Sequence, residues 1–410
     1  MRIGGSEFAV TGHWAGGFEE RGLEQWAGQL RKQLRTPQVG LGLVFMTPRF
    51  FPYAAEVLEI LRVHGQIPLL TGCSSQGLIV EDRELEEDAG LVLALYHFPG
   101  AELKAATFTQ GQVEAAGGPS YWHEQTGVAP DQTNGWLVFA DPFHIDGESW
   151  LNDWNRAYAP LPIVGGLAGG EQSEQRTQVY LNGEVFEEGG VAVSFGGRVG
   201  LASVISQGCT PIGETWTITK VEHNLIHEIG NRPAYEVLAE TFNRLPLDQR
   251  KRAQNNLFVG LVGNEYQEEF HRGDFVIRNL LGGDPLSGIL AVGALPRMGQ
   301  SLQFQCRDAA AATEDLAVLL ERTRRRLSGQ QVYGGCLFTC NGRGRRFFGV
   351  PNHDAALTQR HFGPLALTGF FANGELGPVG GRSFLHGYSA SLVLFVRKQD
   401  DPPRRVAAKR

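Results

Sequence analysis

A cysteine and an arginine three positions apart form the most chemically suggestive pair in the sequence. Cys340-Asn341-Gly342-Arg343-Gly344 follows a short apolar run, and its two glycines permit positive φ and a close approach of the backbone to another molecule. A guanidinium beside a thiol favours the thiolate, which is the nucleophilic form of cysteine. Cys340 is therefore a candidate nucleophile or ligand contact. The structural alternative is a buried cysteine that ends a strand, with Arg343 bonding to carbonyls of its own turn.

A carboxylate between glycines follows a second apolar run. Glu375 comes directly after Gly374, a few residues beyond the run Leu365–Phe371. On a loop with no bulky neighbours it could receive the amine of a ligand or pair with Arg343. The structural alternative is a solvated turn residue, and the sequence leaves these interpretations open.

Two further glycine-rich turns carry groups that could bind a ligand. Cys73-Ser74-Ser75 offers hydroxyls and backbone donors ahead of Gly77. The Gly-x-Ser-x-Gly nucleophile elbow is absent, which disfavours hydrolase chemistry. Gly165–Gly170 does not follow the Gly-x-Gly-x-x-Gly pattern, and the chain contains no Gly-Lys-Ser/Thr P-loop. We therefore predict neither a dinucleotide nor an ATP site.

The histidines do not predict a metal centre. None of the eleven forms a His-x-His or His-Glu-x-x-His pair, and His353-Asp354 with His361 comes nearest to a cluster. Two imidazoles and one carboxylate at this helical spacing are weak evidence for zinc. The sequence therefore predicts no metal and no cofactor.

Repeated strand-helix-strand units are predicted to position these groups. In each unit an apolar run containing a phenylalanine is followed by a helical segment and then by a second run with a glycine. The pairs recur at similar intervals, from Phe45 to Gly72, from Phe139 to Gly165 and from Phe338 to Gly369. We interpret them as three diverged copies of one β-α-β-turn-β unit. The alternative is that any α/β protein alternates strands and helices at this pitch.

Equivalent strand ends in such copies would point the same way. The corresponding corners would then be Cys73–Gly77, Gly165–Gly170 and Phe371–Glu375, with a second set at Thr47, Asp141 and Asn341. Ligands of α/β sheets bind outside the carboxyl ends of the strands. We expect these turns to line one small-molecule crevice.

Periodicity places the remaining elements. Helices are expected at residues 20–35, 53–64, 150–158, 233–245, 309–327 and 354–362. Asp308 is the expected cap of the helix at 309–327. Short strands are expected between residues 199 and 306, and the acidic stretch Glu81–Asp88 is expected to be an exposed loop.

The composition limits the class of protein. A chain of 410 residues exceeds one ordinary core, and 42% hydrophobic with 20% charged residues is typical of a soluble globular protein. The net charge of −7 argues against bulk binding to nucleic acid or anionic membranes. Five cysteines, mostly within apolar runs, suit a reducing compartment. With no apolar run of about 18 residues and no signal-peptide pattern, we expect a cytoplasmic protein that contacts no membrane and no nucleic acid.

The order of the motifs resembles the FIST domain. Three motifs resemble the C-terminal half of that domain, namely Cys340-x-Gly342-Arg343-Gly344, Gly369-Phe370 and Gly374-Glu375-x-x-Pro378. Three further stretches resemble its N-terminal half, namely Gly72-Cys73-Ser74-x-x-Gly77, Glu84-Leu85-Glu86 and residues Leu161 to Gly169. The resemblance implies a sensory module that binds a small ligand such as an amino acid.

The pattern of predicted elements and the resemblance together imply a division of the chain. We expect a helical lead-in at residues 1–36, a FIST N-like domain at 37–215, a FIST C-like domain at 216–397 and a disordered tail at 398–410. The expected fold class is α/β with mixed sheets, in two domains that are built from related β-α-β units and share a crevice.

The glycine-rich turns, together with the resemblance for Cys340, Arg343 and Glu375, give the predicted ligand-binding residues. They are Cys73, Ser74, Gly77, Gly165, Gly166, Ala168, Gly169, Cys340, Asn341, Gly342, Arg343, Gly344, Phe371, Gly374 and Glu375. Arg343 would bind the carboxylate of an amino-acid-like ligand in bidentate fashion, and Glu375 would hold its amine. No kinase, cyclase or DNA-binding segment is recognised, so we expect the output to be a signalling partner protein or a change of oligomeric state. Two other classes stay open, an enzyme that uses Cys340 and an interaction scaffold without a small ligand.

Overall fold

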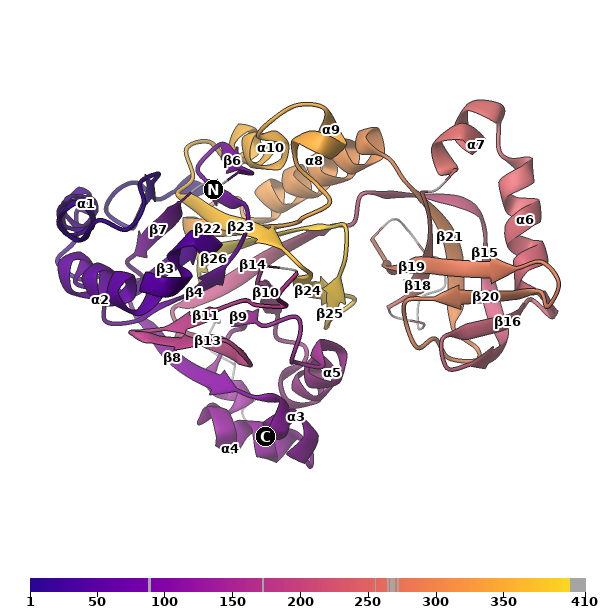
Figure 1. Cartoon of the computed structure of the whole chain (residues 1–410), viewed down its shortest axis with the longest axis horizontal. Helices are drawn as coiled ribbons and strands as arrows, with labels where there is room; N and C mark the ends of the chain where they lie inside the picture. The colour runs from indigo at the N-terminus through magenta and orange to yellow at the C-terminus, as the bar shows by residue number, and fades with distance from the viewer. Residues whose placement is uncertain are drawn as a thin grey trace, which may run out of the picture.

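The computed structural model describes residues 1–87, 90–171, 173–254, 256–263, 265, 270 and 273–398. Figure 1 shows two bodies of unequal size. The larger contains three mixed sheets, and the smaller is formed by residues 209–307, between strand β14 and helix α8. The predicted α/β class with mixed sheets in two halves is confirmed. The predicted boundary between residues 215 and 216 lies inside β15, the first strand of the smaller body.

Each sheet of the larger body has the same strand order. The first sheet is β12 (Glu184–Phe186), β11 (Val179–Leu181), β4 (Leu70–Ser74), β3 (Leu41–Met46), β7 (Leu91–Tyr96) and β2 (Ala9–Trp14). The second is β25 (Arg382–His386), β24 (Glu375–Val379), β10 (Ile163–Leu167), β9 (Trp136–Ala140), β13 (Gly190–Gly197) and β8 (Ala101–Phe108). The third is β6 (Arg83–Leu85), β5 (Leu78–Val80), β23 (Leu367–Ala372), β22 (Gln331–Cys340), β26 (Ala390–Arg397) and β14 (Val199–Ser206), with β1 (Arg2–Ile3) beside β22.

These sheets contain the three predicted units, and they exchange hairpins. The parallel pairs β3–β4, β9–β10 and β22–β23 form the centres of the three sheets. The hairpin that follows β4 joins the third sheet, the hairpin that follows β23 joins the second, and the hairpin β11–β12 joins the first. Each unit therefore completes the sheet of another unit, which gives the larger body an approximate threefold arrangement.

Aromatic rings fill the centre where the three sheets meet. Phe45 and Phe139 lie 5.4 Å apart between ring centroids, and Phe338 lies 5.9 Å from Phe139. These are the three phenylalanines on which the repeat was predicted. A second layer, formed by Tyr96, Phe195 and Phe395, lies at the other ends of the strands. Such pairs add about 0.5–1.5 kcal/mol each beyond the burial of their area.

Helices cover the outer faces because their apolar stripes need burial. The helical segments of the larger body are α1 (Glu20–Gln33), η1 (Pro48–Tyr53), α2 (Ala54–Gly65), α3 (Gln110–Ala115), α4 (Pro119–Thr126), η2 (Pro130–Gln132), α5 (Gly147–Tyr158), α8 (Ala309–Arg326), α9 (Arg345–Phe348) and α10 (His353–Phe362). Helices α1 and α2 pack on the first sheet, α4 and α5 on the second, and α8 and α10 on the third. Asp308 caps α8 through bonds from the backbone N–H groups of Ala310 and Ala311, as predicted.

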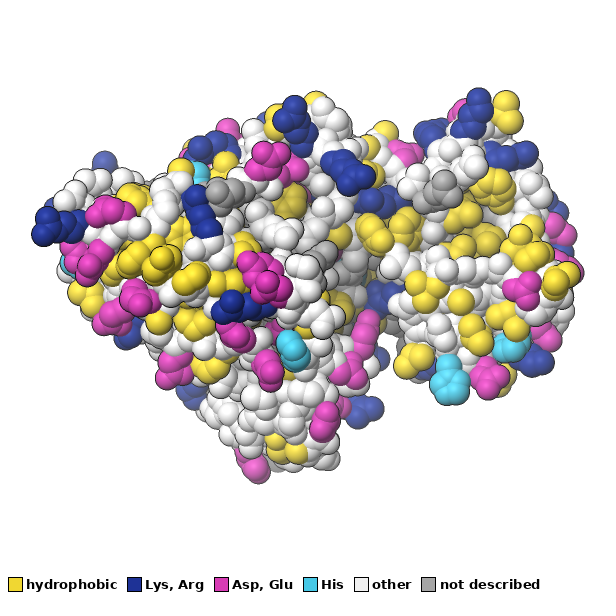
Figure 2. Space-filling view, viewed as in Figure 1, with side chains coloured by type: hydrophobic (Ala, Val, Ile, Leu, Met, Phe, Trp, Pro, Cys, Tyr) yellow, Lys and Arg dark blue, Asp and Glu magenta, His cyan; other side chains and the backbone are white. Residues whose placement is uncertain are grey.

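The smaller body is an antiparallel barrel with two helices. Its elements are β15 (Cys209–Glu222), β16 (Leu225–Ile229), β17 (Arg232–Pro233), α6 (Ala234–Arg244), α7 (Leu247–Ala253), β18 (Leu257–Val262), β19 (Phe275–Asp284), β20 (Ile289–Val292) and β21 (Ser301–Arg307). Strand β15 pairs with both β21 and β16, so the order β15-β21-β18-β19-β20-β16 closes on itself. Figure 2 shows this body joined to the larger one at a narrow waist.

Two local predictions need correction. The stretch Glu81–Asp88 is not an exposed loop throughout its described part, since Arg83–Leu85 forms β6 and Glu84 is buried. The lead-in at residues 1–36 is not only helical, because Ala9–Trp14 forms an edge strand beside β7. The expected disordered tail lies outside the described residues beyond Lys398.

Candidate functional site

The three predicted corners meet at one end of the larger body. Ser74 Oγ donates a 2.7 Å hydrogen bond to the carbonyl of Gly169. The Leu167 amide donates to the carbonyl of Gly374, and the Phe371 amide donates to the carbonyl of Gly77. These bonds link the ends of β4, β10 and β23 directly, so the corners contact one another rather than leaving their backbone free.

The glycines of these corners serve close packing of protein against protein. A Cβ on Gly165 would lie 1.9 Å from the carbonyl oxygen of Val138, and one on Gly77 would lie 2.6 Å from the Phe371 ring. Side-chain or backbone atoms also occupy the space at Gly166, Gly169 and Gly374. The bare backbone predicted to approach a ligand therefore approaches neighbouring strands instead.

Several other predicted ligand contacts are core residues. Cys73, Ala168 and Phe371 are at most 4% exposed and belong to apolar clusters. Burial raises the pKa of the Cys73 thiol well above its ordinary value. Gly344 has a φ of 79°, and the carboxylate of Glu86 fills the space beside it. These side chains support the corner without facing an open site.

Arg343 is committed to a partner inside the protein. Its Nε and Nη2 donate hydrogen bonds of 2.6 and 2.9 Å to the two carboxylate oxygens of Asp354 on α10. Both side chains are buried, at 0 and 1% exposed. Burial alone would raise the pKa of Asp354, but the charge and hydrogen bonds of Arg343 lower it to about 2. The expected bidentate partner of Arg343 is thus an aspartate of this chain and not a ligand carboxylate.

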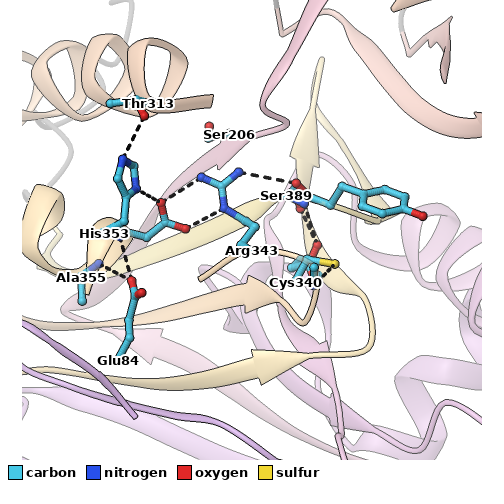
Figure 3. A network of polar contacts seen from close by, with 12 residues as sticks. Glu84, Ser206, Thr313, Cys340, Arg343, His353, Ala355 and Ser389 are labelled. Carbon is cyan, nitrogen blue, oxygen red and sulfur yellow. Dashed lines mark hydrogen bonds and ion pairs between the residues drawn. The ribbon is translucent and has the colours of Figure 1, made fainter. Parts of the chain in front are cut away.

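A second carboxylate holds the same helix from another unit. Glu84 on β6 accepts hydrogen bonds from the backbone N–H groups of Asp354 and Ala355, at 2.7 and 2.9 Å. Figure 3 shows this network, in which Glu84 holds the start of α10 and the Asp354 carboxylate contacts both His353 and Arg343. Burial and the charge of Asp354 raise the pKa of Glu84 to about 7, against the two backbone hydrogen bonds. The network joins the hairpin of the first unit to the helix of the third.

Glu375 is fully buried and only half satisfied. Its Oε2 accepts bonds from the hydroxyl and the amide of Ser389, at 2.7 and 3.1 Å. Its Oε1 is buried and has no hydrogen-bond partner among the described residues. Burial raises the pKa of Glu375 to about 8, although the bonds from Ser389 and the charges of Arg343 and Arg307 lower it. An unpartnered buried carboxylate oxygen is costly and needs an explanation.

The other two units place apolar residues at this position. Glu375 pairs with Gly166 on the neighbouring strand of its sheet, and the equivalent pairs are Leu78 with Phe370 and Val179 with Cys73. All three side chains, those of Glu375, Leu78 and Val179, are 0% exposed. A carboxylate therefore occupies a core position for which leucine and valine suffice elsewhere in the same protein.

Cys340 lies beside Glu375 but is not an activated thiol. Burial, followed by the charge of Glu375, raises the pKa of Cys340 to about 11. The nearby Arg307 and the amide of Gly342, which donates to the sulfur at 3.4 Å, lower it only in part. The predicted activation by Arg343 is therefore absent, because that guanidinium is neutralised by Asp354.

The rim of the corner is partly exposed and includes the smaller body. Asn341 Nδ2 donates to Asn373 Oδ1, and Asn373 Nδ2 donates to the carbonyl of Ala168. Arg307, at the end of β21, donates to the carbonyl of Gly342 at 2.7 Å. Its guanidinium lies 3.8 Å from the ring centroid of Phe347 and 4.8 Å from that of Tyr388.

Sequence reasoning missed several members of this corner. They are Asp354, Glu84, Ser389, Asn373 and Arg307. The Asn373-Gly374 turn and the Glu84 motif were visible signals, whereas Arg307 comes from the smaller body and has no local signature. Among the described residues, no group of three His, Cys, Asp or Glu side chains could hold a metal ion.

The comparison with protein families decides the relationship. A FIST N domain model matches residues 40–232, and a FIST C domain model matches residues 234–378. The chain belongs to the FIST family. FIST domains are sensory domains that bind small ligands. None of the helices in the described ranges is both long and apolar enough to span a membrane.

FIST relatives of similar length occur in mycobacteria. An uncharacterized protein of Mycobacterium bovis is 36% identical over 372 residues, covering 90% of this chain and 94% of the relative. An uncharacterized protein of Mycobacterium tuberculosis is 35% identical over 378 residues, covering 92 and 96%. A solved cyanuric acid hydrolase aligns with 95% of this chain and 100% of its own, at 9% identity and a TM-score of 0.34. A TM-score this low supports no argument about fold or function.

Proposed function

We propose that this FIST protein is a cytoplasmic sensor that binds a small, positively charged or amino-acid-like ligand at the corner of the third unit. The observation that carries the proposal is Glu375, a buried carboxylate in the position that Leu78 and Val179 occupy in the other units. Burying an ionisable group costs stability, and groups perturbed in this way concentrate at functional sites.

The free oxygen of Glu375 defines the ligand chemistry. Oε2 is already bonded to Ser389, while Oε1 lacks a partner in the described part of the chain. An ammonium group would supply the missing donor and the opposite charge. Because the pKa of Glu375 is raised to about 8, an approaching cation would also promote its ionisation.

The second end of the ligand is assigned to Arg307 instead of Arg343. Arg343 is paired with Asp354, whereas Arg307 lies at the rim, beside two aromatic rings. A ligand carboxylate at Arg307 and an ammonium at Glu375 would connect the smaller body to the larger one. Binding would then alter the relative pose of the two bodies, which is a signal that a partner protein or a second copy can read.

Access to the site requires a movement of the rim. Glu375 is 0% exposed, while Asn341 and Gly342, which follow the neighbouring Cys340, are exposed. Displacement of this turn opens a route to Oε1, so binding and conformational change are coupled. The cytoplasmic part of the proposal is supported by the cysteines, all five of which are free thiols.

The experiment is a thermal-shift screen with amino acids, di- and polyamines and matched uncharged amides. A ligand that binds only the folded chain at 100 times its Kd stabilises it by about 2.7 kcal/mol. We expect at least one amine-bearing ligand to raise the melting temperature of the wild-type chain, and Glu375→Gln to abolish the shift. Glu56→Gln, an exposed carboxylate on α2, is the control and retains it. A screen without hits, or an undiminished shift in Glu375→Gln, contradicts the proposal.

A further inference from the structure

We propose that the opposite end of the larger body holds a second site, for a small organic or inorganic anion with several negative charges. This end lies where the antiparallel strands β7, β13 and β26 finish, away from the corner of Glu375. A hollow of about 780 Å³ opens there, between residues of β1, β22, the β7–β8 turn, the β13–β14 turn and the end of β26.

The order of the strands explains why this corner is open. In two units the last strand turns at once into the edge strand of another sheet, from β7 to β8 and from β13 to β14. The corresponding edge strand of the first sheet is β2, which precedes β3 in the chain instead of following β26. The third corner is therefore not closed by a turn of this kind, and the end of β26 lies beside the hollow.

Four cationic side chains line the hollow, from separate parts of the chain. They are Arg2 on β1, Arg198 in the β13–β14 turn, and Arg397 and Lys398 at the end of β26. All four residues are exposed, and no Asp or Glu is among the described residues that line the hollow. In a protein of net charge −7, four converging cations make a local positive potential that attracts and concentrates anions.

Three of the four cations, Arg2, Arg397 and Lys398, have no carboxylate partner within the described part of the chain. Lys398 Nζ donates to the neutral amide oxygen of Asn134 at 2.6 Å. Phe8 and Tyr333 lie in the same lining, with ring centroids 5.2 Å apart. The site thus combines cations with an apolar surface.

The size and charge fit a compact polyanion. Ligand pockets commonly occupy about 300–1,000 Å³, and guanidinium groups bind phosphate and carboxylate oxygens through paired hydrogen bonds. The structure favours no single source of those oxygens, and phosphate and carboxylate anions are therefore separate arms of the test. The site differs in sign from the Glu375 corner, so a ligand suited to one does not suit the other.

Isothermal titration calorimetry of the full chain with inorganic triphosphate and with citrate tests the proposal. We expect saturable binding of at least one of them, weakened by added salt. Arg397→Gln and Arg2→Gln should each lower the affinity about 5-fold, which corresponds to one charge–charge contact in a solvated setting. Both positions are exposed, so neither change should lower the melting temperature.

Lys251→Gln, which removes an exposed cation on helix α7 of the smaller body, is the matched control and should bind as the wild type does. Absence of binding for both anions overturns the proposal. So does binding that falls equally in the control, or that is unchanged in Arg397→Gln and Arg2→Gln. These outcomes are independent of whether amines bind at Glu375.

Discussion

The corner of the third unit has the same backbone arrangement as the equivalent corners of the first two units, but its side chains differ in charge. An amide at the end of the first strand donates to the carbonyl just before the closing strand in all three units, from Thr47 to Gly90, from Asp141 to Gly189 and from Cys340 to Ser389. In the third unit Ser389 occupies the position of Gly90 and Gly189, and Glu375 occupies the position of Leu78 and Val179. The repeated frame therefore supplies the geometry, while a few substitutions in one copy supply the charge.

The second unit shows how a buried carboxylate is satisfied without an arginine. Asp141 accepts bonds from Thr177 Oγ1 at 2.7 Å and from the amide of His144 at 2.6 Å, and its Oδ2 lies 2.8 Å from His144 Nδ1. Every oxygen is occupied, in contrast to Oε1 of Glu375. Asp141 therefore has hydrogen-bond partners within the protein for both of its oxygens, whereas Glu375 lacks a partner for one among the residues that the structure describes.

Removing the partner of Arg343 should have the largest effect. Asp354→Ala leaves a fully buried guanidinium without its counter-charge, because both Nε and Nη2 bond to that carboxylate. We expect a loss of about 3–5 kcal/mol in the free energy of unfolding, measured by urea denaturation. Asp141→Ala, the comparison variant in the second unit, leaves no fully buried cation without its counter-charge, since the His144 side chain is 43% exposed, and should cost less. An equal loss in both variants would contradict the distinction drawn between the two corners.

Placing a glutamate at the equivalent position of another unit should show how much a buried carboxyl group lowers the free energy of unfolding. Leu78→Glu places a carboxyl group in a fully buried apolar position. In this unit Gly90 replaces Ser389, so no serine hydroxyl is present there to donate to the new carboxyl group. The free energy of unfolding should fall by about 2–4 kcal/mol at pH 7, since the group must stay neutral or be desolvated. Leu78→Gln controls for polarity without ionisation. If Leu78→Glu unfolds at the same urea concentration as the wild type, burial of the carboxyl group at this position has no cost.

The pH dependence of stability isolates Glu375. Its pKa is raised from an ordinary value near 4.5 to about 8, so the folded state binds the proton that the unfolded state releases between these values. Its contribution is present below pH 4.5 and is lost as the pH rises toward 8, on the order of a few kcal/mol. Glu84, with a pKa raised to about 7, acts in the same direction. In unfolding titrations from pH 4.5 to 8, Glu375→Gln should show a smaller decline than the wild type, and an identical decline would refute the assignment.

Cys340 should show the smallest effect. With a pKa raised to about 11, it is almost wholly protonated at neutral pH, and its alkylation by iodoacetamide should be slower than that of a free cysteine in a peptide. Cys340→Ser should change the free energy of unfolding by about 1 kcal/mol or less. Rapid and selective labelling of Cys340 at pH 7 would favour the alternative of an enzyme that uses this cysteine.

The sequence predicted the parts of the fold that local pattern determines. The phenylalanines at 45, 139 and 338 identified the repeat, and they now lie in contact at its centre. Strands β18 to β21 of the smaller body and the cap at Asp308 were also predicted, because apolar runs, turn residues and caps act over a few positions, whereas β16 and β17 were not predicted. The exchange of hairpins between sheets could not be predicted, since pairing between distant strands leaves no local signature.

The sequence predicted that the candidate residues lie close together, but it did not predict their hydrogen-bond and ion-pair partners. Cys340, Arg343 and Glu375 do lie at one corner, but the partners that decide their chemistry come from elsewhere in the chain. Asp354 neutralises Arg343, and Arg307 arrives from the smaller body. Glycines at 77, 165 and 374 were expected to face a ligand, whereas they allow strands to pass closely. A glycine pattern alone does not distinguish these two uses of bare backbone.

The replacement Glu375→Leu, with its free energy of unfolding measured alongside the thermal response to the amine screen, tests the central claim most directly. A leucine at this position, as at Leu78 in the first unit, should raise the free energy of unfolding at pH 7–8 by about 1–3 kcal/mol. It should also remove every amine-dependent shift of the melting temperature. A Glu375→Leu variant that is less stable than the wild type, or that still responds to the same amine, would show that this carboxylate serves the fold and not a ligand.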